Sequence, residues 1–190
     1  MGSYGIDLNH NAIDLLKCIV QAGEKKDFRL IINQMNPSDF IKLLPGLEDV
    51  LASGKIEAIG CQVESGSDRI IKLMDRKYTA ESWRDCMLRI NKKFPFVRLS
   101  THIMIGFPGE TEEDFNKTLK LLDFPLFIDW VGFFLFSARP TVYASRLPDP
   151  VSLETKQLRF KRLYRKYLFM YALNVVLRNI RYLKLSIHFI

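Results

Sequence analysis

Apolar and polar residues alternate along this chain in two patterns, one with the period of a helix and one with the period of a strand. Short, mostly apolar runs that are typical of buried strands occupy residues 28–33, 56–63, 97–105 and 128–136. Helical spacing precedes, separates and follows these runs, over residues 9–21, 36–51, 64–74, 79–90, 111–122 and beyond 152.

Helices that alternate with short apolar strands are typical of a parallel sheet covered by helices. The predicted fold class is therefore α/β, with four parallel strands and covering helices. Four strands are too few to close a barrel, since a small parallel barrel needs about eight. The chain also opens with a helical segment rather than a strand. The pattern thus predicts an incomplete barrel with an open sheet edge.

Length and composition indicate the number of domains and the cellular location of the protein. The chain has 190 residues, of which 48% are hydrophobic, and this is enough for one domain with a core. The first residues lack the basic start and apolar stretch of a signal peptide. The longest apolar run, over 168–177, is about half of the roughly 20 residues that span a bilayer. We therefore expect a cytoplasmic protein without a membrane span.

The basic excess is confined to the end of the chain. Residues 153–190 contain nine Lys or Arg and one acid, a net charge of +8, whereas the whole chain carries +7. Four of these cations recur at helical spacing and form one basic stripe: Lys156, Arg159, Arg162 and Lys166. Such a stripe would contact RNA phosphates, form the solvated face of a helix packed on the sheet, or attach to a membrane surface.

Candidate chemistry gathers just after the predicted strands, and in parallel sheets ligands bind at those carboxyl ends. The second strand is followed by ESGSD (64–68), the third by GFPGET (106–111), and the fourth by SARP (137–140). Glycines in such turns permit a positive φ or a close approach to a ligand. The acids after Thr111 suit the start of a helix.

Three single residues of this rim have two readings each. Glu110 precedes the helix cap and is either catalytic or structural. His102 either faces a barrel lumen or is a buried, hydrogen-bonded histidine. Ser67, with Ser65, lies at a helix start, where free N–H groups would meet a carboxylate or hydroxyl, or simply forms a cap.

Four blocks in this order resemble one known family. They are GSYGIDL (2–8), VESGSDRIIKLMDRKYT (63–79), THIMIGFPGETEEDF (101–115) and FSARPTVYA (136–144). The set resembles the radical SAM methylthiotransferases, which modify tRNA adenosines or an aspartate of a ribosomal protein. The resemblance covers about residues 2–163. It implies the carboxyl-terminal portion of a (β/α)6 partial, TIM-like barrel over residues 1–152, followed by a basic helix and tail over 153–190.

The resemblance also implies a cofactor, S-adenosylmethionine (SAM), bound on the rim beside a [4Fe–4S] cluster. Its candidate binding residues follow the second, third and fourth strands: Glu64, Ser65, Ser67, Arg76, Ile105, Gly106 and Arg139. Glu64 and the two serines would lie near the ribose and methionine part, and Ile105 and Gly106 along the adenine. The two arginines would contact the carboxylate or the substrate.

The chain departs from the family where the cluster would bind. The family uses a Cys-x3-Cys-x2-Cys loop after its first strand, and by the resemblance this chain begins after the second strand. Cys18, Cys61 and Cys86 are 43 and 25 residues apart, which is typical of reduced interior thiols rather than of metal ligands or a disulfide framework. In addition, Glu64 stands where the family has Gln, and His102 where it has Asp.

The sequence therefore predicts a fragment of a radical SAM enzyme that has the SAM rim but lacks the cluster loop and is inactive alone. Its expected partners are a tRNA or ribosomal-protein substrate and a second polypeptide that carries the cluster half. The alternative is a non-catalytic remnant or interaction module that binds a nucleoside-like ligand or an RNA. A generic nucleotide-binding protein is disfavoured because no Gly-x-Gly-x-x-Gly or P-loop motif is present.

Overall fold

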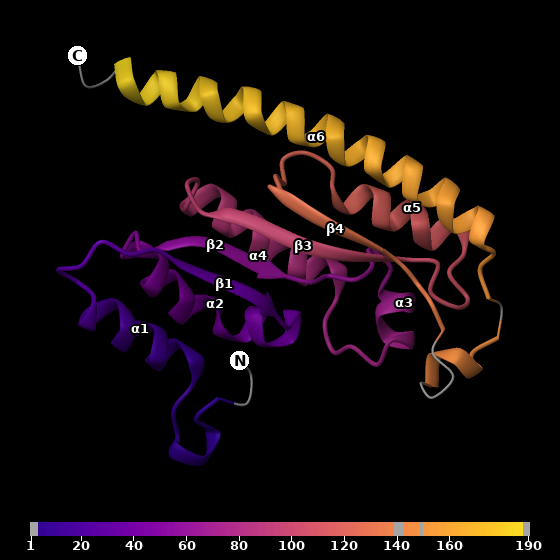
Figure 1. The fold of residues 1–190 in the computed structure, drawn as a ribbon, viewed down its shortest axis with the longest axis horizontal. Coiled ribbons are helices and arrows are strands. Elements are labelled where there is room, and N and C mark those ends of the chain that lie inside the picture. Colours follow the sequence, from indigo (N-terminus) through magenta and orange to yellow (C-terminus); the bar gives the residue numbers. More distant parts are fainter. Residues whose placement is uncertain (1–3, 139–142, 149, 188–190) are drawn as a thin grey trace.

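The computed structural model describes residues 4–138, 143–148 and 150–187. Within them, four parallel strands form one sheet in the order β1-β2-β3-β4 (Figure 1). The strands are β1 (Leu30–Met35), β2 (Ile56–Cys61), β3 (Arg98–Ile105) and β4 (Trp130–Leu135). The predicted α/β class and the four parallel strands are confirmed.

Helices lie between successive strands, as the alternating pattern predicts. They are α1 (Ala12–Ala22), α2 (Pro37–Ala52), α3 (Asp68–Leu73), α4 (Ala80–Lys93), α5 (Glu112–Leu121) and α6 (Leu153–Ile187), with short 3-10 turns at Ile6–Leu8 and Tyr143–Arg146. Thr79 and Thr111 each close a capping box, which satisfies N–H groups that a helix start leaves free.

The core lies on one face of the sheet, where helices cover alternate strand residues. In β3, Leu99, Thr101, Ile103 and Ile105 are buried, whereas the residues between them are only partly buried. The largest buried side chains opposite the strands come from the helices, and include Phe40, Trp83 and Phe115. Removing this apolar surface from water is the main stabilising term of such a layer.

The first strand is displaced from its predicted place, from 28–33 to Leu30–Met35. Its buried residues are Ile32 and Met35, three positions apart instead of two. Gln34 has a φ of 57°, and the register with β2 shifts between Ile32 and Met35. A residue in the left-handed region turns the next side chain to the other face, so regular alternation misplaces this strand.

The second strand also extends its pairing beyond Cys61, and α3 is shorter than the predicted helix over 64–74. Glu64 N–H donates to His102 O (3.0 Å), and Met104 N–H donates to Glu64 O (2.8 Å). Glu64 therefore continues the sheet as a bridge to Ile103. The helix begins only at Asp68.

The long helix α6 runs along the β4 side of the sheet (Figure 1). Leu163 is fully buried and shares the hydrophobic core with the strands. The Phe133 ring of β4 makes edge contacts with Phe160, Tyr164 and Tyr167 of the helix. The predicted tail thus begins at Leu153 and packs on the preceding residues. No helix in the described part of the chain has the length and apolar character needed to cross a bilayer.

The basic stripe of α6 faces the protein. Lys156 Nζ donates to the Phe136 carbonyl (2.8 Å), and Arg159 pairs with Glu110 (2.8 Å). Further along, Arg162 pairs with Glu112 and Lys166 with Asp123. The reading of this stripe as an RNA-contacting or solvated face is wrong for Arg159, which is 5% exposed. Arg159 instead binds Glu110 in the interior, whereas the Arg162 side chain is 46% exposed.

Candidate ligand-binding site at the carboxyl ends of the strands

The loop at the carboxyl end of β2 is joined by hydrogen bonds to α5, the helix that follows β3. The hydroxyls of Ser65 and Thr118 are 3.3 Å apart, and Gly66 N–H donates to Thr118 Oγ1 (2.9 Å). A Cβ on Gly66 would lie 2.5 Å from the Thr118 Cα, so only glycine permits this approach. Ser67 Oγ donates to Asp114 Oδ1 (2.6 Å). The loop after β2 is thus fixed to the start of α5.

Asp114 is the centre of this junction. It is buried and accepts hydrogen bonds from Ser67, Arg69 and Thr111. Burial alone would raise the pKa of the Asp114 carboxyl, but these donors outweigh burial and hold the pKa well below its usual range. Asp114 therefore has a capping role at the start of α5, as predicted for the acids after Thr111, and a second role in joining the loop after β2 to this helix.

Glu64 is the titratable group that the junction presents at the strand end. Its φ of 62° is unusual for a residue with a Cβ. Its side chain is 16% exposed, and one carboxylate oxygen lies 3.8 Å from Arg76 Nη2. Burial raises the pKa of Glu64, and the Arg76 charge offsets part of that rise. Non-glycine residues in this backbone region cluster at functional sites, because surrounding structure must compensate for the strain.

The Gly106 turn adjoins Glu64, since Glu64 is hydrogen-bonded to Met104, two residues before Gly106. Gly106 has a φ of 77°, and its N–H donates to Glu110 Oε2 (2.9 Å). The Ile105 side chain is fully buried, and its carbonyl accepts from Phe136 N–H (2.8 Å). The backbone of three successive strand ends therefore meets at one place.

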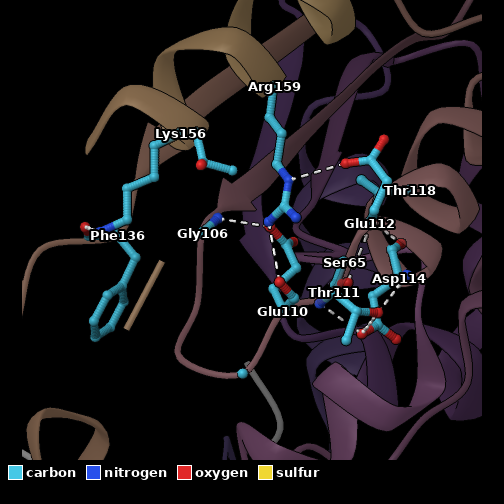
Figure 2. A network of polar contacts seen from close by, with 12 residues as sticks. Ser65, Gly106, Glu110, Thr111, Glu112, Asp114, Thr118, Phe136, Lys156 and Arg159 are labelled. Carbon is cyan, nitrogen blue, oxygen red and sulfur yellow. Dashed lines mark hydrogen bonds and ion pairs between the residues drawn. The ribbon is translucent and has the colours of Figure 1, made fainter. Parts of the chain in front are cut away.

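Glu110 has a structural role in this turn. Its side chain is 1% exposed and is bound by Gly106 N–H and by Arg159 (Figure 2). Burial raises the pKa of Glu110, and the Gly106 N–H and the Arg159 charge offset part of the rise. The reading of Glu110 as a catalytic group is not supported, since the carboxylate faces the protein interior.

Sequence reasoning assigned Lys156 and Arg159 to the tail and did not place them near the rim. A Cβ on Gly106 would lie 2.4 Å from the Lys156 Cγ, so the stem of Lys156 covers this glycine (Figure 2). The Lys156 ammonium lies 5.5 Å from the centre of the Phe136 ring. The sequence does contain a sign of this contact: the basic stripe of α6 is complementary in charge to the acids around the start of α5.

The other candidates have different surroundings. Arg76 has a side chain that is 41% exposed and lies beside Glu64. Arg139 lies outside the described residues. His102 is half-buried, in edge contact with the Trp130 and Phe134 rings 5.4 and 4.9 Å away, and burial lowers its pKa. Its side chain belongs to the sheet face opposite the buried residues of β3, which agrees with the lumen-facing reading.

The described residues contain no group of three His, Cys, Asp or Glu side chains that could hold a metal ion. Cys61 and Cys86 are buried in β2 and α4, and Cys18 is exposed on α1. Burial raises the pKa of Cys61 and disfavours its thiolate. These thiols do not fit an iron–sulfur cluster, and we derive no step through one.

Comparison with known proteins gives the class. Residues 3–122 match the profile of the Radical SAM superfamily, and the chain belongs to this superfamily. Curated relatives named tRNA-2-methylthio-N(6)-dimethylallyladenosine synthase are 37% identical over 171 residues (Staphylococcus epidermidis) and 45% identical over 100 residues (Acetivibrio thermocellus). The predicted resemblance to the methylthiotransferase family is thereby confirmed.

These relatives are longer than this chain. The Staphylococcus alignment covers 87% of this chain but 32% of the relative, so the chain spans about a third of its length. Among solved structures, coproporphyrinogen III oxidase from Escherichia coli, a radical SAM enzyme, matches with a TM-score of 0.65 at 18% identity, over 84% of this chain and 38% of that one. The archaeal Methanocaldococcus infernus Elp3 matches with a TM-score of 0.55 at 18% identity, over 72% and 32%. Both likenesses confirm the predicted fold and nothing more specific.

Proposed function

We propose that these residues form the SAM-binding portion of a radical SAM methylthiotransferase that acts on tRNA. The observation that carries the proposal is the convergence of Glu64 and Gly106, both with positive φ, at adjoining strand ends. Family membership supplies the ligand, and the names of the relatives supply the tRNA substrate. A ribosomal-protein substrate, the other substrate class of the family, has no support among these relatives.

Each candidate residue has a defined part in this proposal. The Glu64 carboxylate accepts hydrogen bonds from the ribose hydroxyls or from the amino group of SAM. The Ile105–Gly106 backbone lies along the adenine. Ser65 and Ser67 act indirectly, because their hydroxyls already bind Thr118 and Asp114. Arg76 and Arg139 remain candidates for the carboxylate of SAM or for the substrate.

The residues at the rim fit SAM in chemical type. A half-buried carboxylate with a raised pKa still accepts hydrogen bonds at neutral pH. SAM would supply the radical chemistry of the superfamily. The chain's own contribution is to bind and orient it.

In this proposal the cluster ligands come from polypeptide outside these 190 residues, either in a longer chain or in a second polypeptide. The 190 residues alone are then inactive. The test is anaerobic reconstitution with iron and sulfide. We expect no visible cluster absorbance and no cleavage of SAM, and a sample that shows both would contradict the inactivity.

Binding of SAM is tested by equilibrium dialysis with labelled SAM. We expect saturable binding to one site, abolished by Glu64→Leu, which removes every hydrogen-bond acceptor of the side chain. The matched control is Glu57→Leu in β2, because Glu57 is also paired with an arginine, Arg98, but lies at the end of β2 opposite to Glu64. Equal binding by all three proteins would contradict the assignment of Glu64, and no binding by any would contradict the site.

The alternative function is a non-catalytic module that binds a nucleoside-like ligand or an RNA. Docking of the basic stripe on the protein removes its main support as an RNA contact. Filter binding of tRNA at two salt concentrations tests the RNA form of this alternative, since the affinity that comes from phosphate contacts falls steeply as the salt concentration rises. No tRNA retention at low salt would remove the RNA form of the alternative.

A further inference from the structure

Glu110 connects the Gly106 turn to the carboxyl-terminal helix. Glu110 Oε2 accepts from Gly106 N–H (2.9 Å) and from Arg159 Nη1 (2.8 Å), and the same Nη1 donates to the Glu110 carbonyl (3.1 Å) (Figure 2). The side chains of Arg159 and Glu110 are 6% and 1% exposed. A group on α6 thus fixes both the backbone and the side chain of the residue that holds Gly106.

This buried pair is not the main attachment of α6. Leu163 and the aromatic contacts with Phe133 already bury an apolar face of the helix. Arg162 and Lys166 add ion pairs nearer the surface. Buried ion pairs contribute little net stability, because desolvation of both charges offsets their attraction. Attachment of α6 to the sheet therefore does not explain the Arg159–Glu110 pair.

The pair is also incompletely satisfied. Among the described residues, Glu110 Oε1 and Arg159 Nε are buried side-chain atoms without a hydrogen-bond partner. The Arg159 Nε lies 3.6 Å from Glu112 Oε2, which is beyond hydrogen-bond distance. Buried polar atoms in native proteins are normally paired, so such exceptions need a reason. The Glu110 oxygen that does have partners, Oε2, is the one that binds the Gly106 N–H and Arg159 Nη1.

We propose that Arg159 is a positioning residue for the ligand site: it holds the Glu110 carboxylate in the orientation that fixes the Gly106 turn. Lys156, one turn earlier on α6, covers Gly106 and binds the Phe136 carbonyl. The helix thus determines the conformation of two strand ends at the rim. This inference rests on the proposed function, in which the Gly106 backbone contacts the ligand.

It follows that docking of α6 and binding at the rim are coupled. A ligand that requires the observed Gly106 turn binds more weakly when α6 is not docked, and by thermodynamic reciprocity the ligand strengthens the docking. The carboxyl-terminal helix is then part of the ligand site, although none of its residues needs to touch the ligand.

The test compares Arg159→Met with Arg162→Met. Both arginines lie over the Phe115 ring from the same helix, but only Arg159 reaches Glu110. The first measurement is hydrogen exchange of the Gly106 amide, which needs no ligand. We expect R159M to lose at least about tenfold of the protection relative to R162M, corrected for global stability. Equal protection in the two variants would overturn the proposal.

The second measurement is the affinity for SAM. We expect R159M to weaken binding by about tenfold or more, and R162M to change it by less than about twofold. If the unsubstituted chain binds no SAM, the proposed function fails, while the amide measurement still tests the positioning role. If the unsubstituted chain binds SAM and R159M binds it equally well, the positioning role fails alone.

A second variant carries the test if R159M does not fold. Arg159→Lys keeps the positive charge but not the planar group that binds the carboxylate and the carbonyl together. We expect R159K to fold, with Gly106 protection below that of the unsubstituted chain. Unchanged protection in R159K would overturn the proposal, because a charge alone would then be sufficient.

Discussion

Ser67 Oγ donates a 2.6 Å hydrogen bond to the carboxylate of Asp114, which lies 47 residues further along the chain. This contact joins the loop after β2 to the start of α5, and places Glu64 beside the Gly106 turn. The candidate site therefore depends on a buried carboxylate that accepts hydrogen bonds from Ser67, Arg69 and Thr111.

Asp114→Asn tests the support. The pKa of Asp114 is well below its usual range, so its ionised form stabilises the fold at every pH above about 4, and this contribution is lost as the pH falls toward the lowered pKa. We expect D114N to lose about 2 kcal/mol of unfolding free energy at pH 7. The loss should be smaller at pH 3.

Urea denaturation at the two pH values checks this prediction. The control is Glu113→Gln, since Glu113 is the neighbouring acid but is 79% exposed and pairs with Lys117. We expect little change for E113Q at either pH. A D114N loss that is independent of pH would contradict the role of the charge.

Gly106→Ala tests the close approach of α6. The φ of 77° disfavours any Cβ, and the Lys156 stem would lie 2.4 Å from it. Gly54→Ala is the control, because Gly54 has a φ of 70° but nothing within 4 Å of a Cβ. We expect G54A to cost about 1 kcal/mol of unfolding free energy, and G106A to cost about 1 kcal/mol more.

The double variant G106A/K156A separates strain from the clash with Lys156. Removing the lysine stem should return G106A toward the cost of G54A. If G106A instead loses no more unfolding free energy than G54A, the Lys156 side chain moves aside freely. Its contact with Gly106 then does not contribute to stability. Thermal or urea unfolding measures all four proteins.

Glu64→Gly tests whether the Glu64 backbone is strained for function. Glycine adopts the φ of 62° without penalty. Within the described part of the chain, the Glu64 side chain is paired with Arg76 at 3.8 Å, which is a weak contact. We expect E64G to raise the unfolding free energy by up to about 1 kcal/mol while abolishing SAM binding. A clear loss of stability would show that the side chain is structural.

Arg159→Met also has a predicted pH signature. Arg159 and the Gly106 N–H favour the ionised form of Glu110, while burial and the nearby Asp114 charge disfavour it. Without Arg159, the pKa of Glu110 rises further above that of the unfolded chain. The unfolded state then releases this proton at a lower pH, so stability falls as the pH rises through the interval between the two pKa values.

We therefore expect R159M to be destabilised more at pH 7 than at pH 5. Urea unfolding at both values measures the difference, and Arg162→Met should show no such pH dependence. A loss of equal size at the two pH values would contradict the claim that Arg159 favours the ionised form of Glu110.

The sequence predicted the order of helices and parallel strands because each apolar run has one dominant period. It also predicted the helix start after Thr111, which depends on local spacing. The displacement of β1 could not be predicted, since it results from one left-handed residue, Gln34. The pattern of apolar and polar residues does not indicate that one residue within a strand has a positive φ.

The candidate site was predicted less completely. Motif order placed Glu64 and Gly106 at neighbouring strand ends, and the structure brings them together. Sequence spacing gave Arg159 a place on a basic stripe but not the direction of that stripe. The direction depends on the buried Glu110, 49 residues before Arg159, whose role the sequence left open between catalysis and structure.

The central claim is that the strand ends around Glu64 and Gly106 form one site for the adenosyl group of SAM. Its most direct test is the change in backbone amide NMR shifts when SAM is added to the chain. The account predicts saturable shift changes at Glu64, Gly106 and their neighbours. It predicts none at Gly54, which lies just before the amino end of β2, opposite to the candidate site. Shifts that avoid Glu64 and Gly106, or that lie elsewhere in the fold, would contradict it.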